Sequence, residues 1–462
     1  MNEDSRKTDE LGYGNIKKLL LSYSLPAITA MTAASLYNII DRVLIGQYVG
    51  ALAIAGLAIT FPVMNLAAAF GSLVGTGAAT MISLRLGAQK HLAATHYLGN
   101  SVVINCIIGI LVTVLGLLFL DPILYLFGAS KDTISYAHDF MHIILCGNMF
   151  MHLYFGLNNA LRASGYPLKA MVATLVTVGV NFVLALIFVC VFKWGIKGAA
   201  WATVIAQFCG LMIVLQHFVN QKNNLHFQKG FFKLNSNIVG HILMMGASPF
   251  LMNFCSCFVL TILNWRLKTY GGDLAIGAYG IINSVGGLCA LIVFGFNMGM
   301  QPIVGYNFGA KQYSRVLQTL KYSLLVGTVI SSAGFLLAEL FPWQMARAFT
   351  NDPILLNLTK SGLRIVFVVF PLVGGQIVCS TFFQAIGMPK ISIFLSLSRQ
   401  LIFLIPMLLI LPLFFDLNGV WAASATADLI AACLTAIVLI VHYQKLKKRA
   451  NETFFMNSKT KN

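Results

Sequence analysis

Residues 19–40 read LLLSYSLPAITAMTAASLYNII, a run of 22 residues without a charge. An α-helix needs about 20 such residues to cross the ~30 Å hydrocarbon core of a membrane, so the run predicts a membrane-spanning helix. Asp41 and Arg42 follow directly, and a second uncharged run then continues to Leu84. The first span therefore either ends at an acid or contains one.

The composition of the whole chain points to the same class. The chain has 462 residues, of which 58% are hydrophobic and only 10% are charged, whereas soluble domains carry about 25% charged residues. We expect an all-α integral membrane protein. Twelve segments can be spans: 17–49, 51–84, 92–120, 134–160, 167–192, 195–219, 238–270, 273–308, 313–341, 358–386, 389–415 and 418–443.

Lysine and arginine are distributed unevenly around these spans. The termini and the even-numbered loops hold 21 of the 31, the odd-numbered loops hold 9, and Arg399 lies inside a span. Cytoplasmic loops carry the excess of Lys and Arg, so we expect both termini in the cytoplasm. The basic stretches 222–233 and 445–449 fit anionic lipid at that surface, so the net charge of +17 needs no nucleic acid.

An internal repeat divides the chain into halves. Residues 48–54 recur 222 residues later as 270–276, Gly87-Ala88 as Gly309-Ala310, and Gly165-Tyr-Pro167 as Gly387-Met-Pro389. Matches at one offset in three separate loops predict two copies of a six-helix unit. Because six is even, both copies run in the same sense, as in parallel transporter repeats.

This repeat predicts a domain organisation and a binding region. We expect an N-terminal lobe (1–219), a cytoplasmic linker (220–237), a C-terminal lobe (238–443) and a basic cytoplasmic tail (444–462). The longest outer loops of the two lobes, 120–139 and 341–360, are expected to contain short amphipathic pieces. A water-filled cleft between the lobes, near the membrane midplane, is the natural substrate site.

The repeat also locates Asp41. The second copy contains Gly271-Gly272-Asp273, which is typical of an exposed turn, so the first copy should turn near Gly50. Asp41 then lies about 13 Å before that turn, within the outer half of the span. An acid at this depth indicates a functional site. The alternative is a boundary Asp-Arg pair at the end of a helix.

Other polar residues inside the spans are candidates for the same chemistry. Tyr37 and Asn38 lie one turn before Asp41. Asn181 in the fifth span and Thr203 in the sixth could meet this face, or could form an ordinary helix-helix hydrogen bond.

Arg399 and Asp428 should lie at similar depth in neighbouring spans, so we expect them to pair. The pair is either a structural ion pair or a second coupling site.

The sequence gives little support for a nucleotide-binding site or a metal site. There is no Gly-Lys-Ser or Gly-Lys-Thr, and hence no nucleotide-binding loop of the Walker A type. His138 and His142 have the spacing of a helical zinc pair, but no third ligand is evident and a solvated pair is the ordinary interpretation. The nine cysteines fall within apolar spans, where we expect small core residues rather than a metal site.

Five stretches together resemble the multidrug and toxic compound extrusion (MATE) family over nearly the whole chain. They are residues 37–46, 161–167, 198–203, 299–310 and 383–390. The resemblance implies twelve helices in two six-helix lobes and export of amphipathic, often cationic compounds in exchange for protons or sodium. It also implies that Asp41, Asn181 and Thr203 form the ion-coupling site, with Tyr37 and Asn38 beside it. Met64 and Asn158 are the residues that we single out as candidate substrate contacts.

This chain departs from the family at one position. Many bacterial members carry a second acid four residues after the fifth-span Asn, where this chain has Ala185. Sodium prefers several hard oxygen ligands, so the loss of a carboxylate favours protons as the coupling ion. No cofactor is expected.

The sequence further predicts a monomer in the bacterial cell (inner) membrane that handles small-molecule drugs and contacts membrane lipid. One alternative is a lipid or lipid-linked glycan flippase of related architecture, which should line its cavity with several Arg and Lys residues. Another is an intramembrane enzyme, which would need clustered nucleophilic and acid-base groups. The spans offer few residues of either kind.

Overall fold

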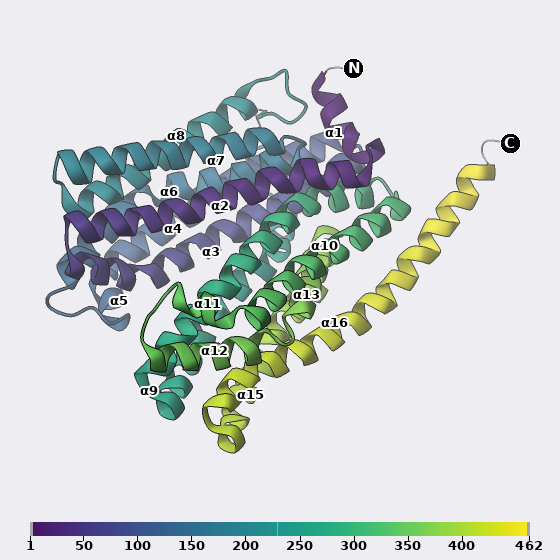
Figure 1. Cartoon of the computed structure of the whole chain (residues 1–462). Helices are drawn as coiled ribbons and strands as arrows, with labels where there is room; N and C mark the ends of the chain where they lie inside the picture. Colours follow the sequence, from purple (N-terminus) through teal and green to yellow (C-terminus); the bar gives the residue numbers. More distant parts are fainter. Residues whose placement is uncertain (1–2, 229, 460–462) are drawn as a thin grey trace. The chain divides into compact units, whose positions relative to one another are not determined.

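The computed structural model describes residues 3–228 and 230–459, and all regular secondary structure in this part of the chain is helical (Figure 1). The first half contains α1 (Glu3–Tyr13), α2 (Ile16–Tyr48), α3 (Ala51–Gly87), α4 (His91–Leu118), α5 (Leu120–Leu126), α6 (Ile134–Ala163), α7 (Pro167–Ala185), the π-helix η1 (Leu186–Val191) and α8 (Gly195–Val219). The second half contains α9 (Ser236–Gly309), α10 (Tyr313–Leu340), α11 (Pro342–Arg347), α12 (Pro353–Phe367), α13 (Phe370–Ala385), α14 (Pro389–Leu397), the π-helix η2 (Ser398–Leu404), α15 (Ile405–Ile410) and α16 (Pro412–Lys459).

These helices account for the twelve predicted spans. In the described chain, 10 helices are long and apolar enough to cross a membrane, and the bent pair α12–α13 makes an eleventh span. The twelfth comes from α9, whose 74 residues are two helices joined at Gly272, where φ is 66° and ψ is −165°. The chain is therefore an all-helical, multi-pass membrane protein.

The backbone repeats the 222-residue offset at its turns. Positive φ angles occur at Gly50 (118°) and Gly272 (66°), at Gln89 (57°) and Lys311 (58°), and at Gly165 (103°) and Gly387 (78°). L-residues with a side chain rarely adopt this conformation, so its recurrence at three matched positions is a structural signature of the repeat. The turns predicted near Gly50 and at Gly271-Gly272 are confirmed.

The tenth span differs from its prediction. The outer loop was expected to continue to residue 360, but α12 begins at Pro353. Asp352 explains the earlier start, because its carboxylate accepts hydrogen bonds from the backbone N–H groups of Ile354 and Leu355, at 2.8 and 2.9 Å. An Asp at the N-cap followed by Pro at the first helical position is a strong helix-start signal. α12 then meets α13 at an angle of 53°.

The chain forms two compact units. Unit 1 contains residues 1–14 and 25–250, and unit 2 contains residues 15–24 and 251–462. These units are not the sequence-derived domains, whose boundaries at residues 219 and 238 stay predictions.

Each unit has its own apolar core. The core of unit 1 includes Ile45, Met141 and Val204, and that of unit 2 includes Leu267, Phe367 and Trp421.

Candidate functional site

Asp41 lies inside a helix and not at its end. α2 continues for seven residues beyond Asp41, to Tyr48, which corresponds to about 10 Å of helix. One carboxylate oxygen, Oδ1, is buried and has no hydrogen-bonding partner within residues 3–228 and 230–459. A buried oxygen of this kind requires a proton, a water molecule or a cation as its partner.

Two further predicted residues lie beside this carboxylate. Asn181 on α7 and Thr203 on α8 are 2% and 5% exposed, and Nδ2 of Asn181 donates a hydrogen bond to Oγ1 of Thr203 at 3.1 Å. Thr203 in turn donates to the carbonyl oxygen of Ala199, which fixes its hydroxyl. Asn181 is close enough to Asp41 to act as its hydrogen-bonding neighbour, so three helices of unit 1 meet here.

Ala185 closes one side of this group. It is 1% exposed and packs with Leu44 and Ala202 in a small apolar cluster. Leu44 follows Asp41 by three residues and Ala185 follows Asn181 by four, so both lie about one turn beyond the polar residue of their own helix. The position of the second family acid is thus filled by apolar packing.

The side chains of Tyr37 and Asn38 lie in different surroundings, since Tyr37 is partly buried and Asn38 is exposed. The Tyr37 side chain lies close enough to Asp41 and to Tyr154 of α6 to interact electrostatically with both. The Asn38 side chain is exposed, and its amide donates to the carbonyl oxygen of Ala34 on the same helix at 2.8 Å. The structure therefore does not bring Asn38 to Asp41.

Asn158 belongs to a buried polar network that the sequence analysis missed. Its Nδ2 lies 3.2 Å from each of three acceptors, which are Oη of Tyr154, Oγ1 of Thr174 and the carbonyl oxygen of Ala170. Its Oδ1 accepts from Nη2 of Arg162 at 2.9 Å. The amide is thus engaged on both sides, and a substrate would have to displace a protein partner to bind it.

Spacing could have revealed part of this network. Thr174 and Asn181 are seven residues apart on α7, or two helical turns, so they share a face. Arg162 is 7% exposed although it is charged, which only the folded helix bundle makes visible. Met64 is partly buried and packs against the core of unit 1, as an ordinary packing residue does.

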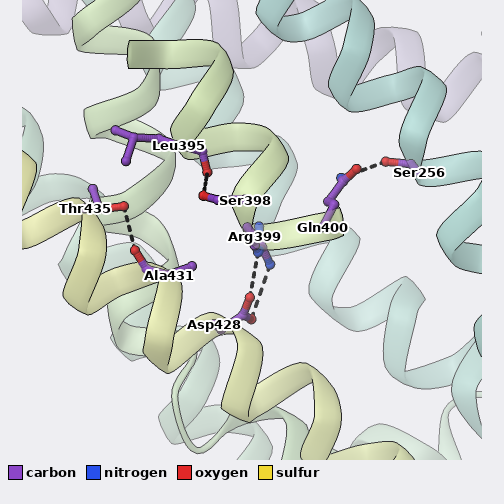
Figure 2. Close-up of polar contacts among 8 residues, drawn as sticks. All are labelled: Ser256, Leu395, Ser398, Arg399, Gln400, Asp428, Ala431 and Thr435. Atoms are coloured by element: carbon purple, nitrogen blue, oxygen red, sulfur yellow. Dashed lines mark hydrogen bonds and ion pairs between the residues drawn. The ribbon is translucent and has the colours of Figure 1, made fainter. Parts of the chain in front are cut away.

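Arg399 and Asp428 lie together in unit 2, as their depths predicted. Arg399 donates from Nε to Oδ1 of Asp428 at 2.6 Å and from Nη2 to Oδ2 at 3.2 Å (Figure 2). The Arg399 side chain is 32% exposed and that of Asp428 13%. The contact is a two-pronged, charge-assisted pair, the geometry that arginine and carboxylate favour.

A π-helix positions this pair. Ser398–Leu404 forms η2, which directly follows α14, and a π-helical turn displaces side chains from their α-helical positions. Figure 2 shows neighbouring residues of η2 reaching different helices: Arg399 meets Asp428 of α16, and Gln400 donates to Oγ of Ser256 in α9 at 2.9 Å. The π-helix thus links two other helices of unit 2.

The histidines of α6 do not form a recognisable metal centre. The rings of His138 and His142 stack with centroids 5.8 Å apart, and Nε2 of His138 lies 3.8 Å from Oδ1 of Asp121. Within the described ranges, no three His, Cys, Asp or Glu side chains cluster as metal ligands would.

Comparison with known proteins matches the chain twice to one family model. The model, described as MatE, matches residues 26–187 and 249–410. The two matched segments begin 223 residues apart, which agrees closely with the repeat read from the sequence and from the turns. They cover most of the chain, so the match concerns its architecture and not one motif.

Full-length relatives and solved structures agree with that match. "Multidrug export protein MepA" of Staphylococcus haemolyticus (strain JCSC1435) is 26% identical over 94% of this chain and 96% of its own length. The protein of the same name from Staphylococcus aureus (strain NCTC 8325 / PS 47) is 26% identical over 92% of this chain and 93% of its own. "Crystal structure of MATE in the bent conformation" superposes with a TM-score of 0.91 at 23% identity, over 98% of this chain and 100% of that chain. "Outward-facing conformation of a multidrug resistance MATE family transporter of the MOP superfamily" gives a TM-score of 0.90 at 23% identity, over 97% and 99%. At 23% identity, the likeness to these solved structures establishes the fold of this chain alone.

Proposed function

The chain belongs to the MatE family, and from that membership we propose that it is a secondary active antiporter that exports amphipathic, often cationic compounds. The observation that carries the proposal is the double family match, over residues 26–187 and 249–410. Relatives of similar length named multidrug export proteins support the same activity. The absence of a Walker A sequence is consistent with an ion gradient as the energy source.

We assign the coupling to Asp41. It is an ionisable group with a buried, unpartnered Oδ1 among the described residues, and it neighbours the hydrogen-bonded pair Asn181–Thr203. The charged carboxylate attracts a cationic compound, whereas the protonated form does not. Proton and compound therefore exclude one another at this site, which is the condition for exchange.

The same group favours protons over sodium. Sodium requires several oxygen ligands, and the position that would supply a second carboxylate is Ala185, which packs against Leu44 and Ala202. Proton uptake by Asp41 needs no further ligand. The oxygens of Asp41 and Asn181 are the atoms that would have to hold sodium if sodium were the coupling ion.

The proposal includes a location and an assembly state. We propose that the protein is a monomer in the bacterial cell (inner) membrane with both termini in the cytoplasm. The excess of Lys and Arg in the termini and even-numbered loops supports this orientation. The proposed activity is transport alone, without chemical modification of the exported compound.

The test is export by the purified protein in liposomes under separately imposed gradients. Wild-type protein should export a fluorescent organic cation under a pH gradient without sodium. Asp41→Asn keeps the shape of the side chain but cannot titrate, so it should still bind the cation while export driven by the gradient stops. Asn38→Ala is the control variant. It removes an exposed amide on the same helix without changing Asp41, so export should continue.

Each outcome of this experiment tests a separate part of the proposed function. Wild-type export that requires sodium would refute the choice of ion. An Asp41→Asn protein that exports at the wild-type rate would refute the role of Asp41. Failure of the wild type to move any of a panel of organic cations under either gradient would refute drug export.

A further inference from the structure

Unit 2 contains a groove of about 660 Å³ between α10, α16 and the junction of α12 with α13. Its lining is almost entirely apolar, apart from Thr426 and two charged side chains. Its lining includes Phe335, Glu339, Arg364, Ala422, Ala425 and Leu429. The volume lies within the range of pockets that hold small organic ligands, about 300–1,000 Å³.

The two charges form a loose ion pair. Nε of Arg364 lies 3.6 Å from Oε1 of Glu339, and their side chains are 49% and 43% exposed. A guanidinium has five N–H donors, and this single long contact leaves donors for another acceptor. The pair differs from Arg399 and Asp428, which are joined by two hydrogen bonds.

The charges mark one end of the groove. Glu339 is the penultimate residue of α10, next to the loop that leads to α11, so it lies near a membrane surface. Arg364 is twelve positions into α12, but the 53° bend between α12 and α13 lets it lie at the level of Glu339. From this end the groove runs inward along Phe335 and along residues 422–429 of α16, about 10 Å of helix.

We propose that this groove is a binding site for a phospholipid whose headgroup carries both a phosphate and a primary ammonium group, as in phosphatidylethanolamine. The phosphate binds Arg364, the ammonium group binds Glu339, and one acyl chain lies against Phe335, Ala425 and Leu429. An apolar groove on a membrane helix is filled by lipid chains, and the charge pair at its end selects the headgroup.

Arg364 and Glu339 together discriminate between phospholipid headgroups, because each binds a different group of the lipid. Arginine binds phosphate in a two-pronged geometry, so any phospholipid satisfies Arg364. Glu339 repels a second negative charge, and it receives no N–H hydrogen bond from a choline group. Phosphatidylglycerol offers Glu339 only neutral hydroxyl donors, and phosphatidylcholine offers a positive charge without an N–H donor, so each binds Glu339 less strongly than a primary ammonium group does. Phosphatidylethanolamine satisfies both halves.

The experiment is native mass spectrometry of the full-length protein after exchange into an equimolar mixture of the three lipids. We expect at least several-fold more bound phosphatidylethanolamine than either other lipid. Arg364→Gln should reduce this retention several-fold, and Glu339→Gln should abolish the discrimination against phosphatidylglycerol. Ala425→Phe should remove the bound lipid while both charges remain, because the ring fills the groove.

A matched control removes a charge outside the groove. Lys321 lies on the same helix as Glu339, about 27 Å of helix away from it, and does not line the groove. Lys321→Gln should therefore leave lipid retention unchanged. If Ala425→Phe does not fold, Ala422→Leu provides a second obstruction. Equal retention of the three lipids, retention that survives both Arg364→Gln and the obstruction, or an organic cation bound in place of lipid would each overturn the proposal. The assay measures binding alone, so its result is independent of whether the protein exports drugs.

Discussion

Arg399 of η2 holds Asp428 of α16 through two hydrogen bonds, of 2.6 and 3.2 Å, although 29 residues separate them in the chain. Both charges are at least two-thirds shielded from solvent within unit 2. A shielded charge is costly without its partner. We propose that the pair is structural, and this proposal leads to the first prediction.

Removing one partner should destabilise the protein more than removing both. Arg399→Ala or Asp428→Ala leaves a buried charge unpaired, which costs about 3–5 kcal/mol in soluble proteins, and the remaining exposure of Arg399 favours the lower end. The double variant should recover most of the folded yield. Fluorescence-detected size exclusion and thermal unfolding measure this. If Asp428→Ala folds normally and loses only transport, the pair is a coupling site instead.

The hydrogen bond between Asn181 and Thr203 should matter for transport more than for folding. Thr203→Val keeps the shape but removes the hydroxyl that accepts from Asn181, which leaves a buried amide unsatisfied and free to turn away from Asp41. Such a loss costs about 1–3 kcal/mol. Thr203→Ser restores the hydroxyl and serves as the control. Export in liposomes should fall several-fold for valine only, and equal rates would contradict the role of this bond.

Asn158 should be required for stability because it satisfies Arg162. Asn158→Leu removes the oxygen that accepts from Nη2 of Arg162 and the donor that reaches Tyr154 and Thr174. We expect a loss of about 1–3 kcal/mol or more, since a charged group loses an acceptor. Tyr154→Phe removes only one hydroxyl and should cost less. Thermal unfolding of the two variants gives the comparison, and an unchanged unfolding temperature for Asn158→Leu would contradict the prediction.

Gly272 should resist substitution because of its backbone and not its surroundings. Its φ is 66°, and no atom lies within 4 Å of the position of an added Cβ. Gly272→Ala should therefore destabilise the protein by about 1–3 kcal/mol, the cost of holding a residue with a Cβ in a positive-φ, extended conformation that glycine alone adopts readily. Gly280 also has open space but is helical, so Gly280→Ala should be neutral or stabilising. Similar unfolding temperatures for both variants would show that the turn rearranges.

The proposed orientation predicts which loops are accessible from outside the cell. In a cysteine-free background, Lys131→Cys should react with an impermeant thiol reagent in intact cells, and Gln221→Cys should react only after the membrane is opened. Both side chains are exposed in the structure, so a difference in reaction reports sidedness. The reverse pattern would place the termini outside.

Much of the fold could be predicted from the sequence because a membrane imposes it. The span from Leu19 had to be a helix, since lipid offers no partner for backbone N–H and C=O groups. The offset between Gly50 and Gly272 could be read from composition, because a turn with positive φ restricts the residues it accepts. The start of α12 was predicted too late, because the N-cap formed by Asp352 starts the helix directly at Pro353.

The candidate site was only partly predictable. Asp41, Asn181 and Thr203 could be selected because polar groups in apolar helices are few. The exposure of Asn38 and the engagement of Asn158 with Arg162 could not, because periodicity gives the face of a helix but not the neighbour that this face meets.

The sequence by itself determined that the chain crosses a membrane, that it consists of two copies of a six-helix unit, and that Asp41 and the pair of Arg399 with Asp428 lie among apolar residues. These properties follow from local composition and from spacing along the chain. Only the tertiary structure decided that η2 directs Arg399 and Gln400 to different helices and that Glu339 and Arg364 meet at one end of a groove. Such contacts depend on a π-helical turn and on a 53° bend, whose directions are set by packing between helices far apart in the sequence.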